Sequence, residues 1–214
     1  MRILACLLPL ATLLTGTAAA DLPVYDQCID SDGRAVAVEM NVASAKVVET
    51  VIDQGHPVIR YNPELLPGLS AKARTFLFAR ECGRLSLDRR LDRPETPAQA
   101  RRADCLGVAA MIASGLLGEA EGGRELQSEL VFAEADWERL PGPQRRFDLA
   151  SCPARSALKL PPPGLPSAQQ AKWNGCVRAC ADPLRRCQDG CGGGKCVDGC
   201  VAVYERCEAG CRGE

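Results

Sequence analysis

The chain has 214 residues, of which 46% are hydrophobic, 25% charged and 4% aromatic, with 20 Gly and 15 Pro. This composition excludes collagen, a coiled-coil rod and a wholly disordered polymer, and it allows one ordinary core plus a smaller unit. The 26 Lys and Arg residues balance 27 Asp and Glu residues, which argues against a nucleic-acid partner recruited by net charge. Thirteen Cys and a single His are the more informative counts.

Residues 1–20 predict a cleaved signal peptide. Arg2 precedes an apolar stretch from Ile3 to Leu14, and Ala18-Ala19-Ala20 form a small-residue cleavage site. A transmembrane anchor is the alternative, but this run is shorter than the ~18 apolar residues that span a bilayer. Removal of the leader removes Cys6 and leaves twelve cysteines, which in an exported chain indicate disulfides. We therefore expect a periplasmic (Gram-negative) or secreted protein with no membrane span after cleavage.

Residues 21–152 show the mixed patterning of an α+β domain in which helices dominate. Alternating apolar residues predict strands, and Thr96 followed by Pro97 is typical of a capped helix start. The expected strands are Arg34–Met40 and Pro57–Tyr61, and the expected helices are Ser70–Leu87, Pro97–Leu117, Gly123–Glu134 and a short one from Pro143 to Cys152. The following residues 153–166 hold five prolines, which favours an extended, semi-rigid linker and a domain boundary.

Eight cysteines in residues 167–214 predict a disulfide-stapled helical hairpin. Their spacing is C-x3-C-x6-C-x3-C twice, separated by Gly192-Gly193-Gly194-Lys195. Steps of 4, 11 and 15 residues return to one helical face within about 60°, and the glycines permit a tight reversal. Antiparallel pairing about that turn satisfies all four bridges in one register, and the pattern resembles the α-hairpinin scaffold. The predicted pairs are Cys176–Cys211, Cys180–Cys207, Cys187–Cys200 and Cys191–Cys196.

Two other interpretations of the cysteine ladder remain open. Cysteine quartets can hold a metal, although zinc clusters usually have tighter C-x2-C spacing and reducing surroundings. The hairpin can also be purely structural, since so small a unit needs cross-links to persist. Exposed arginines on its helices favour a rigid docking surface; they are Arg178, Arg185, Arg186 and Arg206.

Residues from about 50 to 152 resemble a family of exported, gluzincin-like zinc metallopeptidases of the HExxH type. The resemblance rests on four runs: Gly55–Pro63, Phe76–Arg84, Ala103-Asp104-Cys105 and Trp137–Arg145. That family carries H-E-C-[GA]-H on one helix and E-x-x-A-D-C on the next. The resemblance therefore implies a zincin-like fold in which two His at i and i+4 bind zinc together with a carboxylate from the next helix. A Glu between the two His acts as the general base.

This sequence departs from the family pattern at each zinc-ligand position. Arg80 and Arg84 stand in the two His positions, and Ala100 stands in the position of the third ligand, a Glu. Only Glu81, the general-base position, and Asp104 remain as vestiges of the site. A guanidinium offers no lone pair to a metal, and without metal no water is activated for Glu81. We expect no metal, no other cofactor and no catalysis.

The two arginines suggest how such a fold persists without zinc. Our hypothesis is that Arg80 and Arg84 supply positive charge near Glu81 and Asp104, so that a salt-bridge cluster replaces the metal. The alternative is that both arginines point to solvent. A lone His such as His56 is more often a hydrogen-bonding residue than a catalyst, so a Cys-His or Ser-His-Asp site is poorly supported.

The remaining cysteines are expected to form two bridges in the first domain. Cys82 and Cys105 lie on the two helices of the resemblance and are expected to pair, which leaves Cys28 for Cys152.

The sequence thus favours an exported pseudo-enzyme that acts as a binding or scaffold module for an unidentified protein or peptide partner. The second hypothesis is a metal-dependent peptidase with rearranged ligands, for example Glu81, Asp104 and His56. The third is an inhibitor or effector activity located wholly in the hairpin.

Overall fold

The computed structural model describes residues 28–87, 91, 93–118, 121–153 and 168–211. The expected signal peptide at 1–20 lies outside these residues, and so does the expected linker except for Pro153. The described chain is a mixed α+β fold with a small sheet and a C-terminal helical hairpin joined by disulfides, as the sequence predicts at this level.

A four-stranded mixed sheet forms the centre of the molecule. Its strands are β1 (Cys28–Ile29), β2 (Ala35–Met40), β3 (Val48–Asp53) and β4 (His56–Tyr61), in the spatial order β1-β2-β4-β3. The β2–β4 pair is parallel, and the other pairs are antiparallel. Gln54 and Gly55 link β3 to β4 with positive φ angles of 49° and 83°, as a two-residue hairpin turn requires. Strands β2 and β4 were expected; β1 and β3 were not.

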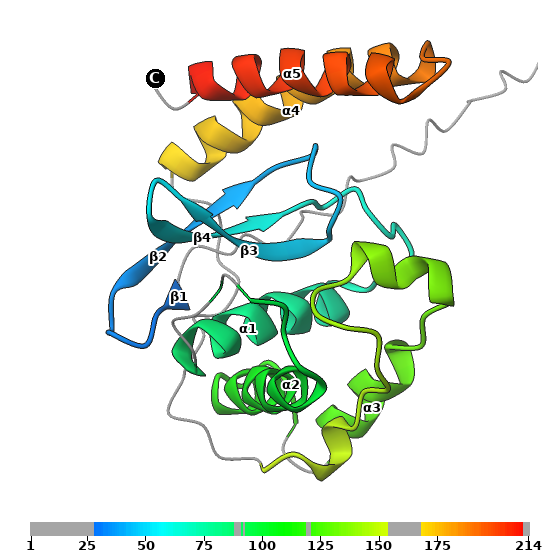
Figure 1. The fold of residues 1–214 in the computed structure, drawn as a ribbon. Coiled ribbons are helices and arrows are strands. Elements are labelled where there is room, and N and C mark those ends of the chain that lie inside the picture. Colours follow the sequence, from blue (N-terminus) through cyan, green and yellow to red (C-terminus); the bar gives the residue numbers. More distant parts are fainter. Residues whose placement is uncertain (1–27, 88–90, 92, 119–120, 154–167, 212–214) are drawn as a thin grey trace, which may run out of the picture.

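Two long helices form successive layers on one side of the sheet. Helix α1 (Ala71–Leu87) packs on β3, and α2 (Pro97–Ala113) packs on α1 (Figure 1). The expected Thr96 cap is present, in a capping box with Gln99. Gly107 brings the two helices close together, because a Cβ there would lie 2.8 Å from the backbone nitrogen of Arg80. The backbone at the centre of α1 therefore packs directly on the backbone of α2.

The rest of the first unit is shorter and less regular than expected. It contains α3 (Gly122–Glu129) and two 3-10 turns, η1 (Glu134–Arg139) and η2 (Leu149–Ser151). The expected helix from Pro143 to Cys152 is wrong over most of its length. Phe147 and Leu149 are buried in the core, so side-chain packing rather than helix formation orders this segment.

The C-terminal hairpin covers the opposite face of the sheet. Helix α4 (Ala168–Asp189) continues through Pro183 and is followed by α5 (Gly194–Cys211), and both lie above the sheet in Figure 1. Val177, Leu184 and Tyr204 belong to the same buried cluster as the sheet residues. The Tyr204 hydroxyl accepts a hydrogen bond from the Val42 backbone N–H at 3.3 Å. The hairpin is therefore packed on the rest of the chain rather than held away from it.

The hairpin surface differs in one respect from the expected docking face. Arg185 forms an ion pair with Glu64, which follows β4. Burial raises the pKa of Tyr61 on β4 to about 12, although the charge of Arg178 and a hydrogen bond with Asn174, both on α4, act to lower that pKa. Arg178, Arg186 and Arg206 are exposed.

The hairpin bridges are Cys176–Cys211, Cys180–Cys207, Cys187–Cys200 and Cys191–Cys196. These are the pairs that antiparallel helices about a central turn require.

The first unit pairs its cysteines differently from our expectation. The structure joins Cys28 to Cys82 and Cys105 to Cys152, in place of Cys82–Cys105 and Cys28–Cys152. Successive helical residues point about 100° apart, and it is Gly83 that faces α2: a Cβ there would lie 2.8 Å from the Leu106 Cβ. Cys82 consequently faces β1, while Cys105 faces η2.

Six disulfides in the described residues are typical of a chain exported to an oxidising compartment. Within the ranges that the structure describes, no helix combines the length and the apolar character needed to cross a membrane.

Candidate functional site

Arg80 is the centre of a buried ion-pair cluster. Arg80 lies at the middle of α1 with a fully buried side chain. Its guanidinium donates hydrogen bonds to the carboxylates of Glu81, Glu95 and Asp104, the last at 3.2 Å from Nε. All three carboxylate side chains are at most 5% exposed. One cation therefore joins α1, α2 and the loop between them.

Glu81 has both carboxylate oxygens engaged. Oε1 accepts from Arg80, and Oε2 accepts a 2.7 Å hydrogen bond from the Thr50 hydroxyl of β3. Arg84, one turn further along α1, places its Nη1 3.6 Å from Oε2. Glu81 is thus held between the sheet and two guanidinium groups.

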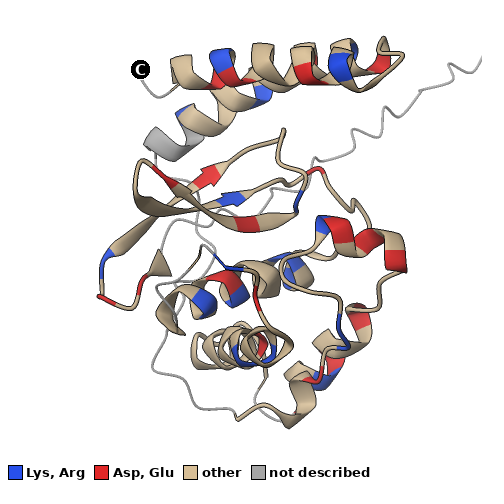
Figure 2. Cartoon of the chain, viewed as in Figure 1, with Lys and Arg blue, Asp and Glu red and all other residues tan. Residues whose placement is uncertain are grey.

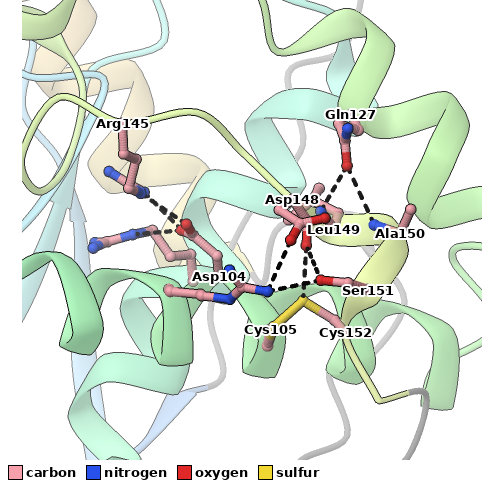
Figure 3. The surroundings of a disulfide bond; sticks show 11 residues. Asp104, Cys105, Gln127, Arg145, Asp148, Leu149, Ala150, Ser151 and Cys152 are labelled. Carbon is pink, nitrogen blue, oxygen red and sulfur yellow. Dashed lines mark hydrogen bonds and ion pairs between the residues drawn. A yellow bond between two sulfur atoms is a disulfide. The ribbon is translucent and has the colours of Figure 1, made fainter.

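Asp104 is bound from its other side by Arg145. Arg145 donates from Nε to Oδ2 at 2.7 Å and from Nη2 to Oδ1 at 2.6 Å, a bidentate pair (Figure 3). The guanidinium also donates to the carbonyl oxygens of Pro141 and Pro143 and lies 4.7 Å from the centre of the Phe147 ring. These contacts hold Arg145 against Asp104, the residue that precedes Cys105 of the Cys105–Cys152 bridge (Figure 3).

The cluster is electrically balanced. Figure 2 shows Lys and Arg positions beside Asp and Glu positions on α1 and the neighbouring elements. Burial alone would lower the pKa of Arg80, but the charges of Glu81, Glu95 and Asp104 together raise it above its ordinary value. The guanidinium therefore stays protonated. Three arginines face three carboxylates; the arginines are Arg80, Arg84 and Arg145.

The structure brings together some of the predicted site residues and separates others. Arg80, Glu81 and Asp104 are in direct contact, and Arg84 lies at the edge of the cluster with 19% of its side chain exposed. Neither Arg80 nor Arg84 simply points to solvent. Ala100 is fully buried on α2, one turn before Asp104, and contributes no polar atom. His56 is exposed where β4 begins, at the turn from β3.

Two members of the cluster were not among the site residues predicted from the sequence. Glu95 lies directly before the cap of α2, and Arg145 lies in an irregular segment. Gly142 is the clue that sequence reasoning passed over: its φ is +76°, and a Cβ there would lie 2.6 Å from Nη2 of Arg80. A glycine between two prolines allows this loop to close over the guanidinium.

Only cysteines group closely enough to share a metal ion in the ranges that the structure describes. Sulfur atoms lie within 4.8 Å of one another in two groups, Cys176–Cys180–Cys211 and Cys187–Cys191–Cys200. All six belong to disulfides, whereas zinc binds the free thiolate. The carboxylates of the cluster are instead directed at arginines, so this donor set does not fit a zinc ion.

A pocket of about 250 Å³ opens beside the cluster. Arg84 and Glu95 belong to both the cluster and the pocket wall. The other lining residues are Leu87, Arg93, Pro94, Thr96, Gln99 and Arg102. The wall therefore carries three cationic side chains and one anionic one.

No protein-family model matches the chain, and neither a curated protein nor a solved structure matches it.

Proposed function

We propose that the chain is an exported, catalytically inactive metallopeptidase-like protein that acts as a binding or scaffold module for a protein or peptide partner. The proposal includes a zincin-like assignment for the first unit and a periplasmic or secreted location. Its main support is Arg80, a buried guanidinium at the position where the resembled family has its first zinc-binding His.

The chemistry of this arrangement does not suit metal-dependent hydrolysis. Arg80 has no lone pair, and its raised pKa keeps it charged. Glu81 would have to accept a proton from a bound water, yet its two oxygens already accept from Arg80 and Thr50.

The same contacts support retention of the fold for another purpose. Zinc would offset the charge of buried carboxylates, and here the arginines do so. Buried charges persist when they are paired and hydrogen-bonded, as Glu81 and Asp104 are. The arginine-lined pocket beside them supplies a surface for binding.

No observation favours the two other functions over this one. A peptidase built from Glu81, Asp104 and His56 would need these residues together, but His56 is exposed at the β3–β4 turn. An effector activity confined to the hairpin would not need the contacts that the hairpin makes with Val42 and Glu64 of the first unit.

A hydrolysis assay tests the proposal. The oxidised full-length chain is incubated with a library of internally quenched peptides, with and without added zinc, beside Glu81→Gln and Arg124→Gln. Arg124 is exposed on α3 and serves as a surface control. We expect no hydrolysis above buffer in any sample. Turnover that Glu81→Gln abolishes and Arg124→Gln keeps would show an active peptidase and refute the proposal.

A further inference from the structure

The pocket beside the cluster has an excess of positive charge that no described residue neutralises. Arg93 and Arg102 line it, and both are exposed. Neither forms an ion pair with another described residue. Two guanidinium groups are thus available to an anion.

The inner wall of the pocket carries one positive side chain, Arg84, and one negative side chain, Glu95. Arg84 is already shared with the cluster, since its Nε lies 4.0 Å from Oε1 of Glu95. That Oε1 is buried, yet it accepts no hydrogen bond from any described group. A buried acceptor without a donor is costly. A ligand donor next to the anion would satisfy it.

We infer that this pocket binds a carboxylate, with Arg93 and Arg102 as its cationic partners and a donor of the same ligand directed at Glu95. The inference rests on the proposed binding function and names its ligand class. Guanidinium groups bind carboxylates through paired hydrogen bonds. The nearby negative charge of Glu95 disfavours a phosphate dianion, and a volume of about 250 Å³ suits one or two amino-acid residues.

Carboxylates of this kind have two sources, a free amino acid and the C-terminal residue of a peptide. In both, an ammonium or amide N–H lies close to the carboxylate, which matches the pairing of arginines with the Glu95 oxygen. Thr96 and Gln99 stand at the same wall, where the capping box of α2 fixes their positions.

Calorimetric titration of the oxidised full-length chain tests the inference. The probes are acetyl-Ala-Ala, its C-terminal amide, free alanine and inorganic phosphate. We expect acetyl-Ala-Ala or alanine to bind, and the tighter of the two identifies the source of the carboxylate. We expect the amide to bind at least tenfold more weakly than its acid. The variant Arg93→Gln/Arg102→Gln should weaken the carboxylate at least tenfold, whereas the surface control Arg124→Gln should not.

Several outcomes would overturn the inference. They are an amide that binds as well as its acid, phosphate that binds more tightly than either carboxylate, no carboxylate binding at millimolar concentrations, and equal losses in the double variant and the control. Each leaves the catalytically inactive assignment intact. Conversely, peptide hydrolysis would refute that assignment while the titration still reported on the pocket.

Discussion

Replacement of Arg80 by methionine should destabilise the protein far more than loss of a surface charge. Methionine fills part of the buried volume but leaves Glu81, Glu95 and Asp104 without their shared cation. Removal of one partner of a buried ion pair costs about 3–5 kcal/mol. Because Arg145 still compensates Asp104, we expect the free energy of unfolding to fall by about 3 kcal/mol, a large part of the ~5–15 kcal/mol of a typical domain.

The assay is urea unfolding followed by circular dichroism, with all disulfides intact. Arg101→Met is the matched control, because Arg101 on α2 forms an exposed ion pair with Asp148 at 2.8 Å. Such pairs contribute about 0–1 kcal/mol. Addition of Glu81→Gln to Arg80→Met should restore part of the loss, since it removes one uncompensated charge. If Arg80→Met cost no more than Arg101→Met, the buried cluster would not be a stabilising unit.

Four smaller predictions follow from the same structure. Arg84→Ala should cost about 1 kcal/mol in urea unfolding, because Arg84 is partly exposed and its closest carboxylate is 3.6 Å away; no measurable loss would remove it from the cluster. Gly142→Ala should cost at least about 2 kcal/mol, because the positive φ and the adjacent guanidinium leave no room for a Cβ; an unchanged urea midpoint would contradict this packing. Tyr204→Phe should speed amide exchange at Val42, whose N–H it leaves without its acceptor, and equal exchange in both proteins would count against the docked hairpin. Peptide mapping without reduction should recover the linkages Cys28–Cys82 and Cys105–Cys152. Recovery of Cys82–Cys105 and Cys28–Cys152 would instead support the pairing that we expected from the sequence.

The parts of the fold that follow local rules were predictable from the sequence. Thr96 and Pro97 locate the start of α2, and the symmetric cysteine spacing is sufficient to derive a hairpin register. Strand β3 was missed although Val48, Val51 and Ile52 have strand propensity. The two-residue turn at Gln54-Gly55 that joins it to β4 was the available signal.

Long-range pairings were harder to predict because they depend on which face of an element is buried. Cys82 and Gly83 are neighbours in sequence, yet only their orientation on α1 decides which partner Cys82 meets. The sequence was sufficient to place Arg80, Glu81 and Asp104 in one candidate site, whereas the carboxylate of Glu95 and the guanidinium of Arg145 come from loops whose closure no local pattern specifies.

The most direct test of the central claim is the amount of zinc bound per chain, measured by elemental mass spectrometry. The protein should be purified from an oxidising compartment with its disulfides intact, loaded with zinc and freed of excess metal. We predict a value near zero, because Arg80 occupies the cluster and the grouped sulfur atoms are in disulfides. A value near one zinc ion per chain would contradict the account and would place a metal-dependent peptidase first.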